Sequence, residues 1–137
     1  ASPEHVISST GHEYILAGWG REGDTAVVAQ CASEPIGAAW YRFWNPELHS
    51  YGYIDSSTPE IGIAVEPRWR RRGVGKALIE ALADVASRAG IARLCLSVES
   101  DNPALFLYEK SGFVRLGLVE DSWTMVRTLE IGSLHRR

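Results

Sequence analysis

The stretch that decides the fold reads Val65-Glu66-Pro67-Arg68-Trp69-Arg70-Arg71-Arg72-Gly73-Val74-Gly75-Lys76-Ala77. It joins a short β-branched segment, Glu60 to Val65, to a longer segment whose apolar residues recur at helical spacing until Gly90. Backbone N–H groups and the positive dipole end at the start of a helix attract anions, and glycine lets an anion approach the main chain closely. The stretch therefore predicts a binding site for phosphate groups.

The sequence does not match two common phosphate-binding motifs, because residues that each motif requires are absent. A P-loop would need Gly in place of Arg70 and Ser or Thr in place of Ala77. A dinucleotide-binding fingerprint would need a third glycine three residues after Gly75, where Leu78 stands. A basic loop that only solvates the start of a helix stays open as the simpler interpretation.

The stretch matches a third signature, Arg/Gln-x-x-Gly-x-Gly/Ala, and it carries Val65 and Pro67 at the usual places before it. The sequence therefore resembles the GCN5-related N-acetyltransferase (GNAT) superfamily, in which this loop holds the pyrophosphate of acetyl-CoA. The resemblance implies that the strand residues Ile63, Ala64 and Val65 hydrogen-bond the pantetheine arm of the cofactor. It also implies that the following loop residues bind the cofactor: Arg70, Arg71, Arg72, Gly73, Val74, Gly75 and Lys76.

A second segment strengthens the resemblance. Asn102, Pro103 and Gly112 are start and stop signals for a short helix. The same segment is similar to the second cofactor motif of the family, with Asn102, Ala104, Tyr108, Gly112 and Phe113 in register. The resemblance implies that Asn102 and Tyr108 lie at the cofactor and that Tyr108 gives a proton to the departing thiolate. The alternative for Tyr108 is an ordinary core aromatic residue.

Acetyl transfer to an amine also needs a base, because an alkylamine with a pKa of about 10.4 is mostly protonated near pH 7. Glu60 is the first candidate, since the family often carries an acidic residue at or near the start of this strand. The alternative is a solvated carboxylate at the end of a strand. Glu99 and His49 are weaker candidates.

The element order predicts an α/β fold (α+β mixed sheet with helices on its faces). Strands are expected over residues 25–32, 36–43, 60–65, 94–98, 113–117 and 123–129, with a tight turn at 33–35. The helices are expected at 74–89 and from Asn102. This is the order of the GNAT-like acyl-CoA N-acyltransferase fold. We expect a single domain over residues 1–137, with the cofactor-binding core at about 60–129.

The N-terminal part departs from the family pattern, which opens with a strand and two helices. Few residues precede Thr25 here, so the usual first strand and first helix are expected to be missing. Glu13 to Trp19 is expected to be a remnant of the second helix. The aromatic and polar loop from Trp44 to Pro59 is long for a compact domain, and we expect it to shape the acceptor site.

Composition and charge exclude several classes of protein. The chain has 137 residues, 45% of them hydrophobic and 23% charged, which suits one ordinary soluble domain. Because no apolar run approaches the roughly 20 residues of a membrane span, a membrane protein is excluded. A net charge of −3 argues against a nucleic-acid binder. No secretory signal is visible, which favours a cytoplasmic protein.

The cysteines and histidines do not suggest a metal site. Cys31 and Cys95 each lie in an apolar, strand-like run without a CxxC pattern, which is typical of buried thiols in a reducing compartment. The four histidines are scattered, with no pair spaced four residues apart. We expect neither a disulfide nor a metal ion.

The resemblance and the residues together predict an acetyl-CoA-dependent N-acetyltransferase in which a primary amine, on a small molecule or a peptide, attacks directly in a ternary complex. Two other classes stay open. One is a catalytically silent acyl-CoA binding or sensor module. The other is a phosphate-binding interaction domain for RNA or phosphoprotein, which the negative net charge of the chain disfavours. Apolar surface left by the missing elements and five tryptophans favour a homodimer.

Overall fold

The computed structural model describes residues 5–10, 13–19, 25–44 and 54–130. The chain divides into two compact units, Ala1–Tyr41 with Gly62–Val85 and Arg42–Ile61 with Ala86–Arg137. Strand β5 (Glu60–Val65) and helix α1 (Val74–Arg88) each contribute residues to both units. A single acetyltransferase domain over residues 1–137 stays a prediction.

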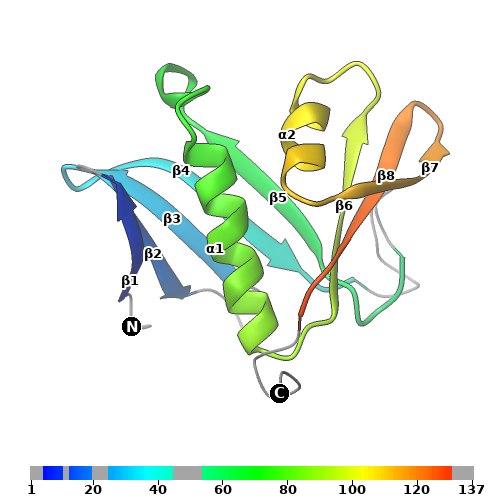
Figure 1. Cartoon of the computed structure of the whole chain (residues 1–137), viewed down its shortest axis with the longest axis horizontal. Helices are drawn as coiled ribbons and strands as arrows, with labels where there is room; N and C mark the ends of the chain where they lie inside the picture. The colour runs from blue at the N-terminus through cyan, green and yellow to red at the C-terminus, as the bar shows by residue number, and fades with distance from the viewer. Residues whose placement is uncertain (1–4, 11–12, 20–24, 45–53, 131–137) are drawn as a thin grey trace. The chain divides into compact units, whose positions relative to one another are not determined.

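The first unit is built on antiparallel strands. These are β1 (His5–Thr10), β2 (Glu13–Trp19), β3 (Thr25–Cys31) and β4 (Glu34–Arg42), which pair in chain order, and β5 lies next to β4. Helix α1 lies across one face of these strands (Figure 1). The sheet of this unit therefore supports both β5 and the start of α1, the two elements that flank the arginine-rich stretch.

The core of this unit forms between alternate strand residues and one side of α1. Val27 and Ala29 on β3 are buried, as the two-residue period of a strand requires. Leu78 and Leu82 are fully buried on α1 and share one side of the helix because they are four residues apart. Burial of each leucine stabilises the fold by about 1.5–3 kcal/mol. The predicted apolar side of this helix is confirmed.

The N-terminal segment corrects two expectations. Glu13–Trp19 is the strand β2 and not the remnant of a helix, and it pairs with strands on both sides. Because His5–Thr10 is a strand as well, the expectation that the first strand is missing was wrong. Tyr, Ile and Trp favour a strand and Gly18 disfavours a helix, so pairing on both edges outweighed the weak helical pattern. The described residues before Pro67 contain no helix.

The β3–β4 hairpin is confirmed, but its turn lies earlier than expected. Ala32 and Ser33 form a two-residue turn with φ of 52° and 74°. Two consecutive positive φ angles match the twist of a two-residue hairpin. Pro35, expected in the turn, instead belongs to β4 and pairs with Gln30 beside an irregularity in the register. The turn therefore holds non-glycine residues in the left-handed region.

The second unit contains the start of β5 and three further strands. Strand β6 (Arg93–Glu99) pairs with β8 (Ser122–Thr128) in antiparallel register, and β8 pairs with β7 (Val114–Val119). The ladder between β5 and β6 is parallel and consists of one pair, Glu60↔Cys95. A parallel pair beside antiparallel ladders makes a mixed sheet, as the sequence predicted.

Helix α2 (Ala104–Lys110) packs against β6 (Figure 1). Gly112, just after this helix, has φ of 93°, and Gly90, just after α1, has φ of 84°. Both glycines were predicted to end helices, Gly112 as a left-handed residue, and these predictions are confirmed. Strand β7 leaves Val114, Leu116 and Leu118 exposed. A homodimer stays a prediction.

The strained β3–β4 turn generates a test of the fold. Replacing Ala32→Asn together with Ser33→Gly should raise the free energy of unfolding by about 1 kcal/mol, because Asn and Gly adopt positive φ at lower cost. Urea denaturation measures the change. Ala26→Gly, within β3, is the matched control and should lower stability by about 0.5–1 kcal/mol, since glycine weakens a strand interior. A loss of stability in the Asn-Gly variant would contradict the turn geometry.

Candidate functional site

The connection from β5 to α1 is a tight, hydrogen-bonded path. Pro67–Trp69 forms the 3-10 helix η1, in which the Trp69 N–H donates to the Glu66 carbonyl at 2.8 Å. Proline is pre-organised for this first turn because its φ is fixed. The Arg70 Nε then donates back to the Val65 carbonyl at 3.2 Å. One main-chain hydrogen bond within η1 and one hydrogen bond from the Arg70 side chain therefore hold the arginine run against the end of β5.

Left-handed backbone turns the chain from η1 into α1. Arg71 has φ of 63° and Gly73 has φ of 85°. A Cβ atom at Gly73 would meet no other atom within 4 Å, so the space beside this residue is open. Helix α1 begins at Val74, and its first turn closes with the Ala77 N–H donating to the Gly73 carbonyl at 3.0 Å. The first N–H groups of a helix lack partners within it, so this end is suited to an anion.

The charged side chains around this helix start are exposed. Arg70, Arg71 and Arg72 lie on the surface, with the Arg72 guanidinium 4.9 Å from the centre of the Trp69 ring. The Lys76 Nζ lies 3.8 Å from a Glu80 carboxylate oxygen, but both side chains are about half exposed and the pair contributes little to stability. The cations therefore create a local positive potential on a mildly acidic chain.

An open groove of about 660 Å³ lies beside β5 in the same unit. The Glu66 N–H donates to the Ile36 carbonyl at 2.8 Å, and this bond joins two residues that line the groove. At Gly37 a Cβ atom would lie 3.0 Å from the Ala64 carbonyl oxygen and 3.1 Å from the Leu78 side chain, so only glycine fits there without a shift. Sequence analysis missed this groove, although the run of small residues 37–39 was a signal. Its lining is Val28, Gln30, Pro35, Ile36, Gly37, Ala38, Ala64, Val65, Glu66 and Pro67.

In the second unit, Glu60 begins β5 opposite the buried Cys95. The Cys95 Sγ lies 3.7 Å from the Thr58 carbonyl and 3.5 Å from the Pro59 carbonyl. Burial, followed by the negative charges of Glu60 and Asp55, raises the pKa of the Cys95 thiol to about 12. The thiol therefore stays protonated and acts as a small buried donor.

Tyr108 is buried on α2, with 9% of its surface exposed. Its ring meets Phe113 edge to face, with centroids 6.0 Å apart and planes at 67°. Burial raises the pKa of the Tyr108 phenol above its ordinary value. At neutral pH the hydroxyl is therefore protonated and is a proton or hydrogen-bond donor.

Both ends of α2 are held by side chains. The Asn102 Oδ1 accepts a hydrogen bond from the Ala104 N–H at 2.9 Å, so Asn102 caps the helix as the sequence predicted. At the other end the Arg127 Nη1 donates to the Ser111 carbonyl at 2.9 Å. These contacts fix the helix that carries Tyr108.

The candidate residues divide between the two units. The strand residues Ile63, Ala64 and Val65 and the loop from Arg70 to Lys76 belong to the first unit, and Glu60, Asn102 and Tyr108 belong to the second. Glu99 is exposed at the end of β6, while His49 lies outside the described residues with most of the predicted acceptor loop.

Two further observations concern only the described part of the chain. It contains no group of three or more His, Cys, Asp or Glu side chains that would hold a metal ion. None of its helices is long and apolar enough to cross a membrane.

The Cys95 environment generates a test by thiol labelling. At pH 8 a thiol-reactive reagent should modify Cys31, which is partly exposed, and leave Cys95 unmodified, because a pKa of about 12 leaves almost no thiolate. Both cysteines should react in denaturant, where the pKa returns to about 8.5. A Cys31→Ala variant isolates Cys95. Rapid labelling of the folded variant would contradict the buried environment.

Comparison with known proteins places these features in a family. The model of the acetyltransferase (GNAT) family matches residues 2–113. The [Ribosomal protein bS18]-alanine N-acetyltransferase of Escherichia coli is 46% identical over 54 residues, which are 39% of this chain and 36% of that enzyme. The chain spans about a third of the length of the curated relatives it matches.

Solved structures share the fold at lower identity. The E. coli ribosomal-protein-S18-alanine N-acetyltransferase has a TM-score of 0.65 at 22% identity, over 86% of this chain and 77% of that one. The PaiA N-acetyltransferase of Thermoplasma acidophilum, solved in complex with coenzyme A, has a TM-score of 0.65 at 19% identity, over 77% and 61% of the two chains. With the family model covering most of the sequence, the resemblance is confirmed: the chain belongs to the acetyltransferase (GNAT) family.

Proposed function

We propose that this chain is an acetyl-CoA-dependent N-acetyltransferase that transfers the acetyl group to a primary amine by direct attack in a ternary complex. The observation that carries the proposal is the start of α1. Gly73, in the left-handed region with open space beside it, precedes unpartnered helix N–H groups and a cluster of exposed arginines. That combination suits a pyrophosphate group. Membership of the family supports the same ligand.

The residues present fit the cofactor. Backbone N–H groups from Gly73 to Lys76 would hold the pyrophosphate, and Arg70, Arg71 and Arg72 would neutralise its charge. Ile63, Ala64 and Val65 would hydrogen-bond the pantetheine arm, since the single-pair ladder of β5 with β6 at Glu60 does not use their backbone groups. In the second unit, the family motif that contains Asn102 and Tyr108 supports the proposal that these residues also bind the cofactor. When bound, acetyl-CoA supplies an acetyl group activated as a thioester.

We assign the base to Glu60. The acceptor amine is mostly protonated at neutral pH, and only its neutral form has the lone pair that attacks the thioester carbon. Glu60 takes that proton, directly or through one water molecule. A backbone N–H of β5 stabilises the charge that develops on the carbonyl oxygen. The half-buried position of Glu60 at the start of β5 supports this role.

We assign the proton donor to Tyr108. As the carbon–sulfur bond breaks, the sulfur gains negative charge and needs a donor. A phenol with a pKa of about 10 is a weaker acid than a thiol at about 8.5, so a strong hydrogen bond from Tyr108 is sufficient to stabilise the leaving thiolate. Burial raises the pKa of Tyr108 further, so the phenol is a still weaker acid than the thiol and its role is that of a hydrogen-bond donor to the sulfur.

The acceptor belongs to the class of primary amines. The E. coli relative is named for an alanine of a ribosomal protein, which makes a peptide amine one candidate and a small-molecule amine the other. A thiol-release assay with acetyl-CoA, over peptides beginning with alanine and small alkylamines, tests the activity. Binding of coenzyme A without release from any amine would favour a catalytically silent acyl-CoA module.

The glycine before α1 generates a test of cofactor binding. Gly73→Val should weaken coenzyme A binding by about tenfold or more, because the valine side chain would occupy the space proposed for the pyrophosphate. Calorimetry measures the affinity. Gly90→Val is the matched control, since Gly90 also has positive φ (84°) and open space beside it. Both variants should lose about 1 kcal/mol of stability to backbone strain. Equal affinities in the two variants would count against a cradle at Gly73.

Removal of one hydroxyl tests the proton donor. Tyr108→Phe should lower kcat by about tenfold or more while coenzyme A affinity stays nearly unchanged, because the ring still packs on Phe113. Tyr41→Phe, at another buried tyrosine, is the control and should keep full turnover. The measurement is made where the chemical step limits the rate. Full turnover in Tyr108→Phe would reduce this residue to a packing role.

A further inference from the structure

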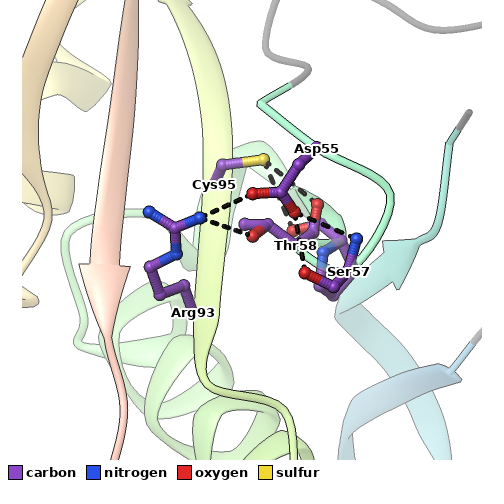
Figure 2. Close-up of polar contacts among 6 residues, drawn as sticks. Asp55, Ser57, Thr58, Arg93 and Cys95 are labelled. Atoms are coloured by element: carbon purple, nitrogen blue, oxygen red, sulfur yellow. Dashed lines mark hydrogen bonds and ion pairs between the residues drawn. The ribbon is translucent and has the colours of Figure 1, made fainter. Parts of the chain in front are cut away.

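The guanidinium group of Arg93 joins the turn before β5 to β6 through two side-chain hydrogen bonds. The Arg93 Nη2 donates to the Asp55 Oδ2 at 2.6 Å and to the Thr58 Oγ1 at 3.3 Å (Figure 2). Arg93 begins β6, and Asp55 and Thr58 lie in the turn that enters β5. Thr58 is only 3% exposed, so its hydroxyl has little access to water as an alternative partner. The guanidinium therefore joins segments that are far apart in the sequence.

The turn itself is ordered by the same carboxylate. The Asp55 Oδ1 accepts hydrogen bonds from the Ser57 N–H at 3.0 Å and the Ser57 Oγ at 2.9 Å. The Thr58 N–H donates to the Asp55 carbonyl at 3.3 Å, which closes the turn. Burial alone would raise the pKa of Asp55, but the bonds from Ser57 and Thr58 and the charge of Arg93 lower it. Asp55 is therefore ionised at neutral pH and holds the turn and Arg93 together.

The turn is also docked on β6 one residue before Glu60. The Cys95 N–H donates to the Pro59 carbonyl at 3.0 Å, and Glu60 is the residue that pairs with Cys95 in the parallel ladder. Because this ladder has one pair, little else in it fixes the start of β5 against β6. The Arg93 contacts add a restraint to those from Cys95, through side chains earlier in the turn.

We infer that Arg93 is a positioning residue: by holding Asp55 and Thr58 against β6, it fixes the backbone that carries Glu60. The inference rests on the proposed role of Glu60 as the base. A catalytic group displaced by about 1 Å can lose about a hundredfold in rate. Arg93 itself touches no reacting atom in this scheme. Its effect should appear in turnover and not in cofactor affinity.

The chain offers a matched control for the substitution. Arg115 binds Glu109 with 2.9 Å between Nε and the carboxylate oxygen, and these side chains are 40% and 38% exposed. The corresponding values for Arg93 and Asp55 are 40% and 41%. Arg115→Gln therefore removes an equally exposed ion pair from the same unit. It should leave turnover and the Glu60 region unchanged.

Three measurements on the full chain test the inference. Arg93→Gln should lower kcat by about tenfold with the KM for acetyl-CoA unchanged, and Arg93→Lys, which keeps charge and donors, should restore most of it. Hydrogen exchange of the Cys95 amide should accelerate by about tenfold or more in Arg93→Gln and not in Arg115→Gln. In a Glu60→Gln background, Arg93→Gln should lower kcat no further.

The outcomes separate this inference from the proposed base. Unchanged hydrogen exchange of the Cys95 amide in Arg93→Gln would overturn the positioning role and leave Glu60 as the base. The same conclusion would follow if Arg93→Gln lowered kcat further in the Glu60→Gln background. Full turnover in Glu60→Gln would overturn the base and the inference together. If Arg93→Gln does not fold, Asp55→Asn replaces it, because Asn keeps the acceptor for Ser57 and removes the charge that binds Arg93.

Discussion

The backbone between Val65 and Val74 is the constraint on which the site depends. In this interval the chain must leave a strand, reverse direction and begin a helix whose apolar side faces the sheet. Positive φ at Arg71 and Gly73 makes the reversal possible, and the bond from Arg70 to the Val65 carbonyl ties the loop to the strand it has left. The N-terminal end of α1 is consequently open, and it is this end that suits an anion.

The titratable groups near the proposed chemistry differ in the cause of their state. Burial keeps the Cys95 thiol and the Tyr108 phenol protonated, the first as an inert donor to carbonyl groups and the second in the donor role that we propose. Hydrogen bonds and the charge of Arg93 keep Asp55 ionised. Burial therefore sets the protonation of Cys95 and Tyr108, whereas hydrogen bonds and a neighbouring charge set that of Asp55.

Several contacts at the site had no signal in the sequence. A Cβ atom at Gly62 would lie 2.6 Å from the Trp40 indole, so a larger residue there would displace that side chain, yet the two residues belong to different strands. Nothing in the sequence distinguishes Arg93 and Asp55 from other charged residues. Only the packing of the turn on β6 brings the Arg93 Nη2 to 2.6 Å from the Asp55 Oδ2. Such pairs depend on strand order and register, which local patterns do not encode.

The sequence by itself determined the family and the start and end of both helices, because glycine spacing, caps and apolar period act over a few neighbouring residues. It also placed the strands from Thr25 onward to within a few residues. Only the tertiary structure decided that Glu13–Trp19 is a strand, since a segment of weak preference takes the conformation that its neighbours pair with. The same holds for the restraint at Glu60, because long-range hydrogen bonds form between residues that the fold, and not the local sequence, brings together.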